Sequence, residues 1–192
     1  MERSAIAEAV TRAIAEEDGY AGLRVSSAGI SVRKPGTPMT GQARDSLEAN
    51  GYETRPHQAR QLEIELLNKT DLVLCMTQRE AAAVMHMVGN HHKNEKPAYI
   101  PEIGILPVFA GYKEEVGNPN NKVRKIHPLL RGPVYAAFGF FDLEDPRRVQ
   151  EVYNDLTACI IDYAESTLER LLREGRITKQ AITKQASYIV TP

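Results

Sequence analysis

A short apolar run followed at once by a helix start constrains the fold more than any other feature of this sequence. Leu72–Met76 consists of apolar residues only; it has the length of a strand and the composition expected when both faces of that strand are buried. Thr77 and Glu80 then form a Thr-x-x-Glu capping box, the pattern that opens a helix, and this helix is expected to continue through Met87. A buried strand leading into a helix is the repeating unit of an α/β sheet.

Helices and short strands alternate in the same way upstream of this unit. Apolar residues at helical spacing predict a helix over Ala5–Ile14 that stops by Gly19, and Leu23–Ser26 is expected to follow as a short strand. Thr40 is the expected N-cap of a second helix, which stops at Gly51.

Downstream the pattern weakens and then returns. Leu62–Leu67 is typical of a short third helix, whereas Val88–Ala137 offers only Tyr99–Ile100 and Ile105–Phe109 as candidate strands. An apolar stripe over Val149–Leu171 predicts a long last helix. The alternation indicates an α/β fold with a sheet that is expected to be parallel.

The C-terminal tail repeats itself, because Ile177–Ala181 and Ile182–Ala186 have the same sequence. Two copies of five residues are too few for a solenoid. A helical extension and a loosely held tail both remain open as interpretations.

Composition and cysteine usage exclude several function classes. The formal net charge is −1, so no global field favours nucleic acid or an anionic membrane. No apolar run approaches the roughly 20 residues of a membrane span. Cys75 and Cys159 are the only cysteines and show no metal-ligand spacing. The expected compartment is therefore a reducing cytoplasm.

Several segments, in the right order, carry a family resemblance. Arg3–Ala9 resembles the start of the first helix in low-molecular-weight protein-tyrosine phosphatases, where a Cys-x5-Arg-Ser phosphate loop opens that helix. Phe141–Pro146 looks like the acid loop of the same family. Between them the resemblance continues through Val25–Gly29, Pro38–Gly51, His57–Leu62 and Asp71–Leu74.

This resemblance implies a domain organisation. Residues 1–172 would form a three-layer α/β domain of the phosphotyrosine protein phosphatase I type, with a small parallel sheet flanked by helices. Residues 88–137 would be a long insertion within it, and residues 173–192 a C-terminal tail. The first central strand of the family has no counterpart in the sequence and is expected to be missing.

The resemblance also assigns roles to five side chains. Arg3 would bind the phosphoryl group, and Ser4 would support a thiolate nucleophile. Ser27 and His57 would belong to the hydrogen-bond network that holds the phosphate loop in shape, and Asp145 would be the general acid. The implied substrate is a phosphorylated protein or another phosphate ester, and the implied reaction uses neither a metal nor another cofactor.

The nucleophilic cysteine itself has no counterpart. Counting Cys-x5-Arg backward from Arg3 runs past Met1, and two explanations are open. The favoured one is that a strand and its turn, on the order of a dozen residues, have been lost upstream of an internal methionine. The other is a pseudophosphatase that acts as a binding or regulatory domain.

Other chemistries of related enzymes are weaker alternatives. Protein arginine phosphatase activity stays open, because the discriminating residue would lie in the missing loop. Arsenate reductases of the thioredoxin-coupled kind need further cysteines after the strand that ends near Met76, and none occurs before Cys159.

Plainer interpretations exist for single residues. Asp145-Pro146 alone would be an ordinary helix start with Asp as the N-cap. His91 and His92 are adjacent, so their side chains point in different directions and do not suggest a metal site.

Two geometric expectations follow from the family resemblance. Arg3, Ser4, Ser27, His57 and Asp145 should gather at one edge of the sheet, where the strands end. The missing central strand would lie between the strand expected at Leu23–Ser26 and the strand Leu72–Met76. These two strands should therefore either leave its position in the sheet empty or pair directly with each other.

Overall fold

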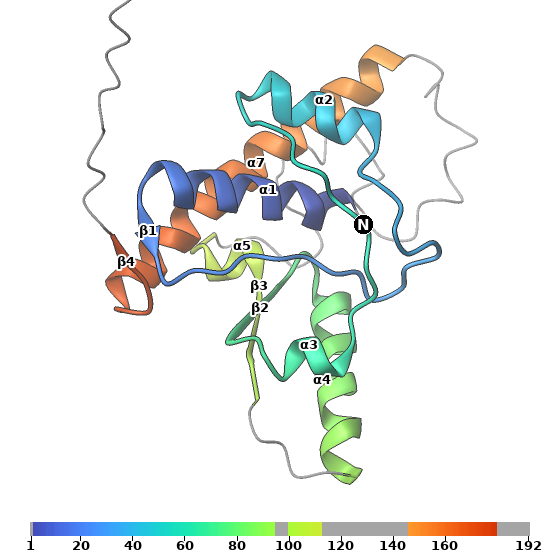
Figure 1. The fold of residues 1–192 in the computed structure, drawn as a ribbon, viewed down its shortest axis with the longest axis vertical. Helices are drawn as coiled ribbons and strands as arrows, with labels where there is room; N and C mark the ends of the chain where they lie inside the picture. The colour runs from blue at the N-terminus through green and yellow to red at the C-terminus, as the bar shows by residue number, and fades with distance from the viewer. Residues whose placement is uncertain (1, 95–99, 113–145, 180–192) are drawn as a thin grey trace, which may run out of the picture.

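The computed structural model describes residues 2–94, 100–112 and 146–179 (Figure 1). Three long helices dominate these residues, and the strands are short. In chain order the elements are α1 (Glu2–Glu17), β1 (Tyr20–Ala21), α2 (Gly41–Ala49), α3 (Ile64–Leu67), β2 (Leu72–Cys75), α4 (Gln78–Asn94), β3 (Glu102–Ile105), α5 (Leu106–Phe109), α7 (Pro146–Arg173) and β4 (Thr178–Lys179). No helix within the described ranges is both long and apolar enough to cross a membrane.

The parallel pair β2–β3 lies between two groups of helices (Figure 1). Val73 pairs in register with Ile103, and Cys75 with Ile105, and these side chains pack against α3 and α4. The next residue along β2, Leu74, points to the opposite face and packs against α1 and α7. The fold is therefore α/β, with a small parallel sheet between helical layers, as the sequence predicted.

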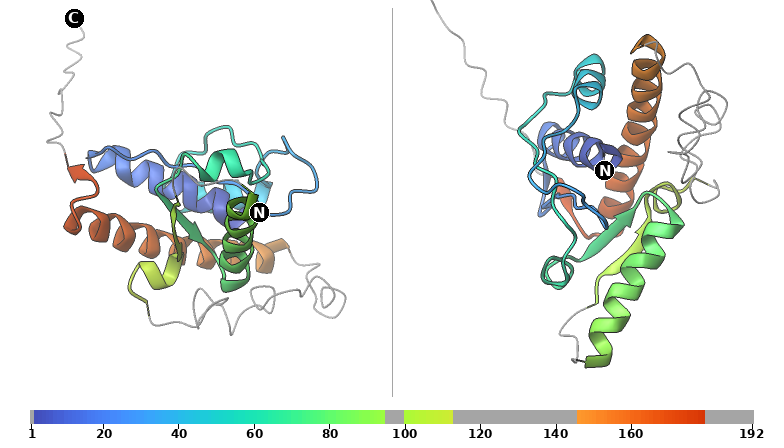
Figure 2. Two further views of the ribbon diagram at one scale, coloured as in Figure 1. Left: turned by 90° about the horizontal axis from the view of Figure 1, so that it is seen from below. Right: turned by 90° about the vertical axis from the view of Figure 1, so that its right-hand side faces the viewer.

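The larger core lies on the α1–α7 side of the sheet. Ile6 and Val10 of α1 have no exposed surface, and Ile160 of α7 is 1% exposed. Leu47 of α2 joins the same cluster. Figure 2 shows α1 and α7 running along each other while α4 lies apart from them, on the other side of the sheet.

The expected helix starts agree with the structure, whereas the end expected at Met87 was wrong, because α4 continues to Asn94. Thr40 caps α2, because its side-chain oxygen accepts a hydrogen bond from the Ala43 N–H at 3.4 Å. Gly51 follows α2 with a φ of 83°, a left-handed conformation that glycine adopts without strain. Thr77 and Glu80 form the capping box at the start of α4: the Glu80 N–H donates to Thr77 Oγ1, and the Thr77 N–H donates to Glu80 Oε2.

The prediction of a strand at Ile105–Phe109 was wrong. The strand, β3, is Glu102–Ile105, and Leu106–Phe109 forms the short helix α5 instead. Pro107 at the start of α5 explains the difference, because its fixed φ and missing N–H suit a first helical turn.

The prediction of a strand at Leu23–Ser26 was also wrong. This segment belongs to no strand; side chains, rather than a neighbouring strand, bond its backbone and that of Ser27. Arg12 donates to the Val25 carbonyl at 3.3 Å, and the Ser27 N–H donates to Glu8 at 2.9 Å. A single parallel bridge joins Gly29 to Gln61 farther along.

The C-terminal segment begins with ordered contacts. Ile177 is 6% exposed and packs with Leu168 and Leu171, and β4 then pairs antiparallel with β1. Lys179 forms an ion pair with Asp18 at 3.2 Å. Thr178 and Lys179 of the first repeat copy thus form a strand and not a helical extension; residues 180–186, which include the second copy, lie outside the described residues.

Candidate functional site

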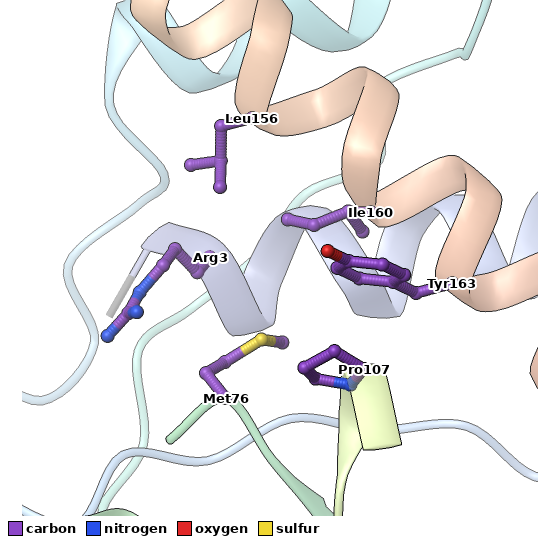
Figure 3. Close-up of a pocket in the computed structure, with 6 residues that line it drawn as sticks. All are labelled: Arg3, Met76, Pro107, Leu156, Ile160 and Tyr163. Atoms are coloured by element: carbon purple, nitrogen blue, oxygen red, sulfur yellow. The ribbon is translucent and has the colours of Figure 1, made fainter. Parts of the chain in front are cut away.

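Arg3 lies in the first turn of α1, next to the carboxyl end of β2. It lines a small pocket together with apolar and aromatic side chains from the end of β2, from α5 and from α7: Met76, Pro107, Leu156, Ile160 and Tyr163. In Figure 3 the guanidinium of Arg3 points away from these apolar residues. Ser4 is half-buried in the same turn of α1. A helix start with a guanidinium at the end of a parallel strand is suited to binding an anion.

Glu80 holds Arg3 from across the fold. Arg3 Nη2 donates to Glu80 Oε1 at 3.3 Å, and both side chains are partly exposed. Glu80 was expected from the sequence only as a capping residue of α4. Its contact with Arg3 joins two residues 77 positions apart, and no local pattern reveals a pairing of that kind.

Ser27 and His57 meet at a third residue, Glu8, that sequence reasoning missed; their role in holding a phosphate loop stays a prediction. Ser27 Oγ lies 3.2 Å from His57 Nε2. Glu8 Oε2 accepts hydrogen bonds from the Ser27 N–H at 2.9 Å and the Ser27 hydroxyl at 2.6 Å, and it lies 3.7 Å from His57 Nε2. Arg12 donates to the other oxygen of Glu8. A carboxylate within the apolar stretch Ala5–Val10 was the signal that could have revealed Glu8.

This Glu8–Ser27–His57 group does not have the geometry of a nucleophilic triad. In such a triad the carboxylate and the hydroxyl contact opposite ring nitrogens of the histidine. Here both lie on the Nε2 side, and His57 Nδ1 is buried without a hydrogen-bond partner among the described residues. The arrangement instead fixes the end of the extended segment at Ser27 against α1.

The five residues predicted from the sequence thus fall into separate groups. Arg3 and Ser4 begin α1, and Ser27 and His57 gather at Glu8, five residues farther along α1 and about 7.5 Å along its axis. Asp145 lies outside the described residues, so its place at the site stays a prediction. α7 begins at Pro146, which agrees with an Asp-Pro helix start.

Neither cysteine is placed to serve as a nucleophile at the start of α1. Cys75 ends β2 and is 7% exposed, and Cys159 lies in α7 and is 5% exposed. Burial, and to a lesser degree the charge of Glu80, raises the pKa of Cys75 to about 11. A thiol in this state is protonated near neutral pH and therefore unreactive.

Within residues 2–94, 100–112 and 146–179, no three histidine, cysteine, aspartate or glutamate side chains gather in a way that could hold a metal ion. His86 is bonded to Asn90, one turn later in α4.

Comparisons with family models and with solved structures both point to one fold family. The family model of the low molecular weight phosphotyrosine protein phosphatases matches residues 1–102. No curated protein matches the sequence.

Among solved structures, a mutant of the YwlE arginine phosphatase with a phosphorylated active-site serine is 20% identical, with a TM-score of 0.64 and 91% of each chain covered. A low molecular weight phosphotyrosine phosphatase from Vibrio cholerae O395 is 18% identical, with a TM-score of 0.62 and coverage of 88% of this chain and 89% of that one. The YwlE arginine phosphatase from Geobacillus stearothermophilus is 20% identical, with a TM-score of 0.60 and coverage of 91% and 88%. At these identities the likeness shows a shared fold.

Proposed function

Because the chain belongs to the low molecular weight phosphotyrosine protein phosphatase family, we propose that it serves the hydrolysis of phosphomonoesters on proteins, phosphotyrosine first among them, through a phosphocysteine intermediate. The observation that carries the proposal is the place of Arg3, in the first turn of α1 beside the end of β2. Asp145 and the nucleophile are assigned by the family resemblance.

Arg3 and the start of α1 would bind the phosphoryl group together. The N–H groups of a first helical turn have no partners within the helix, and the helix dipole adds a partial positive charge there. A guanidinium can donate two parallel hydrogen bonds to two phosphoryl oxygens and stabilise the charge that develops as the ester bond breaks. Ser4, in the same turn, would donate its hydroxyl to a thiolate.

The thiolate would belong to a Cys-x5-Arg loop that ends at Arg3, since Cys75 and Cys159 are buried elsewhere. Its sulfur attacks phosphorus, an S–P bond forms, and the bond from phosphorus to the leaving oxygen breaks. Water then attacks phosphorus, the S–P bond breaks, and inorganic phosphate leaves.

Asp145 would move the protons of both steps. Its carboxylic acid protonates the leaving oxygen in the first step, and the resulting carboxylate accepts a proton from the attacking water in the second. The acid is regenerated at the end of the cycle, so no cofactor is consumed.

Ser27, His57 and Glu8 would brace this site without touching the substrate. Their hydrogen bonds fix Ser27, which follows the extended segment 23–26, against α1. A phosphate loop that precedes α1 would lead directly into this helix. The contacts of Glu8 with Ser27 and His57 would give that loop a rigidly held neighbour.

The experiment compares two forms of the protein. Residues 1–192 alone should show no turnover of p-nitrophenyl phosphate above background. A form in which a strand and a Cys-x5-Arg loop lead into Arg3 should hydrolyse it. In that form Arg3→Ala should lower kcat/KM by about 10²–10³, and Asp145→Asn by about 10²–10⁴, while the exposed control Glu65→Gln should leave it unchanged.

The substrate class is tested in the same form of the protein with phosphotyrosine and phosphoarginine peptides. Some solved structures with this fold are described as arginine phosphatases, so a preference for phosphoarginine would redirect the proposal to that ester class. An inactive protein that still binds a phosphopeptide would favour the pseudophosphatase. Turnover by residues 1–192 that disappears in Cys75→Ser or Cys159→Ser would overturn the proposed nucleophile.

A further inference from the structure

We propose that Glu80 is a positioning residue that orients Arg3 for a bound oxyanion; this inference rests on the proposed function of Arg3. Glu80 lies in the first turn of α4, whereas Arg3 lies in the first turn of α1. The ion pair between them joins the starts of two helices at the carboxyl end of β2.

The carboxylate of Glu80 is itself held in place by the backbone. Its Oε2 accepts hydrogen bonds from the Met76 N–H at 3.0 Å and from the Thr77 N–H at 3.1 Å. The Glu80 N–H in turn donates to Thr77 Oγ1 at 3.3 Å. With one oxygen fixed by two backbone donors, the other oxygen, Oε1, is directed at Arg3. The turn between β2 and α4 therefore determines where the guanidinium is held.

The chemistry of guanidinium makes this contact useful. The group is planar and carries five N–H donors. The Glu80 contact uses a donor on Nη2 and so restricts rotation of the plane, which lowers the conformational entropy that Arg3 would lose when it binds a phosphoryl group through a pair of donors. Arg3 is partly exposed, with 28% of its side chain accessible, so without Glu80 it would sample several orientations.

A purely structural role for Glu80, as the cap of α4, predicts a different mutant behaviour. Glutamine at this position of a capping box still accepts the backbone hydrogen bonds through its carbonyl oxygen. Its amide nitrogen replaces Oε1 and cannot accept a hydrogen bond from Arg3. Glu80→Gln therefore keeps the cap and removes the contact with Arg3, whereas Glu80→Ala removes both.

The experiment uses the 192-residue chain and two NMR measurements. The first is the ¹⁵N relaxation order parameter of Arg3 Nε, which needs no ligand. It should fall in Glu80→Gln to below about 0.6, the range of flexible groups, and stay at the wild-type value in Glu65→Gln, an exposed glutamate-to-glutamine change of the same charge. The second is a titration with inorganic phosphate, followed at Arg3 Nε and the Ser4 amide. Phosphate binding should weaken by about three- to fivefold in Glu80→Gln.

The outcomes separate the two proposals. An Arg3 order parameter unchanged in Glu80→Gln, or tighter phosphate binding in that variant, overturns the positioning role; tighter binding would make Glu80 a competitor for Arg3. Thermal midpoints of Glu80→Gln and Glu65→Gln that agree, with a lower midpoint for Glu80→Ala, show that the cap has been preserved. If the wild-type chain binds phosphate no better than Arg3→Ala does, the anion site of the proposed function fails, while the order parameter still decides the role of Glu80.

Discussion

Single side chains take over hydrogen bonds that regular secondary structure would otherwise make. Glu8 accepts from the backbone and the hydroxyl of Ser27, and Arg60 donates to the Ser27 carbonyl at 2.7 Å. Each of these bonds satisfies a polar group in a segment that has no neighbouring strand. These positions are part-buried or exposed, so each bond stabilises the segment that carries Ser27 by about 0.5–1.5 kcal/mol.

Cys75 is predicted to be unreactive in the folded protein. Its pKa is raised from 9.0 to about 11, mainly by burial, which leaves about 100-fold less thiolate than an unfolded cysteine has at neutral pH. Labelling with a disulfide reagent at pH 7.5 should therefore be at least about 100-fold slower for Cys75 in buffer than in denaturant. Mass spectrometry of quenched samples would resolve Cys75 from Cys159, and equal rates in both conditions would contradict the burial argument.

The same pKa shift gives a predicted pH dependence of stability. Well below pH 9.0 the thiol is protonated in both the folded and the unfolded chain, so it contributes no slope. Between 9.0 and about 11 the unfolded chain loses the proton while the folded chain keeps it, so the free energy of unfolding falls as pH rises. Denaturant titrations at several pH values should show a smaller decrease for Cys75→Ala than for wild type, and parallel curves would contradict the assignment.

At the scale of elements, sequence patterns predicted the helices better than the strands. The capping box of Thr77 and Glu80 and the N-cap of Thr40 act within one turn, so the local sequence contains the whole interaction. A strand needs a partner that is distant in sequence, and Leu23–Ser26 has none among the described residues. Gly104 explains part of the misplaced third strand: a Cβ there would lie 3.2 Å from the Leu74 side chain, a tight contact, so packing favours a residue typical of loops inside this strand.

For the candidate site, too, the sequence revealed some residues and missed contacts between residues that are distant in sequence. Arg3, Ser27 and His57 were found by resemblance to a family, and the structure places Ser27 beside His57. Glu8 and the contact of Glu80 with Arg3 were not found, because both depend on how α1 approaches loops and helices far along the chain.

A buried pair of hydroxyls is predicted to fasten α2 to α7. Ser46 Oγ lies 2.5 Å from Thr157 Oγ1 and donates to the Tyr153 carbonyl at 2.8 Å, and neither Ser46 nor Thr157 has exposed surface. Ser46→Ala should lower the free energy of unfolding by about 1–2 kcal/mol, because it leaves the Thr157 hydroxyl with one partner fewer. Thr157→Val should cost a similar amount.

A double-mutant cycle checks this pairing. Ser46→Ala combined with Thr157→Val removes both hydroxyls, so urea denaturation should show a loss clearly smaller than the sum of the single losses. Additive losses would mean that the two hydroxyls act independently.

At the scale of the whole molecule, the described residues form hydrophobic cores on both sides of the two-stranded β2–β3 sheet. Leu67 belongs to the core with α3 and α4 on one side, and Leu168 to a core with Phe109, Leu171 and Ile177 on the other. Figure 1 shows α4 reaching away from the rest of the fold. It packs mainly against α3, β2 and β3, and Glu80 in its first turn also forms the ion pair with Arg3 of α1. The unit of α3 and α4 contacts the rest of the fold mainly through the two short strands β2 and β3, so it can unfold locally while the rest stays folded.

Leu67 and Leu168 provide a matched test, because each is 1% exposed and truncation of a buried leucine to alanine costs about 2–5 kcal/mol. Leu67→Ala should speed amide hydrogen exchange in α3 and α4 by at least about 30-fold, while the centres of α1 and α7 keep their protection. Leu168→Ala, which weakens the core that α7 forms with Phe109 and Ile177, should speed exchange in every element. Hydrogen exchange followed by mass spectrometry would measure both, and Leu67→Ala raising exchange equally in α4 and α7 would show that the two sides of the sheet unfold as one unit.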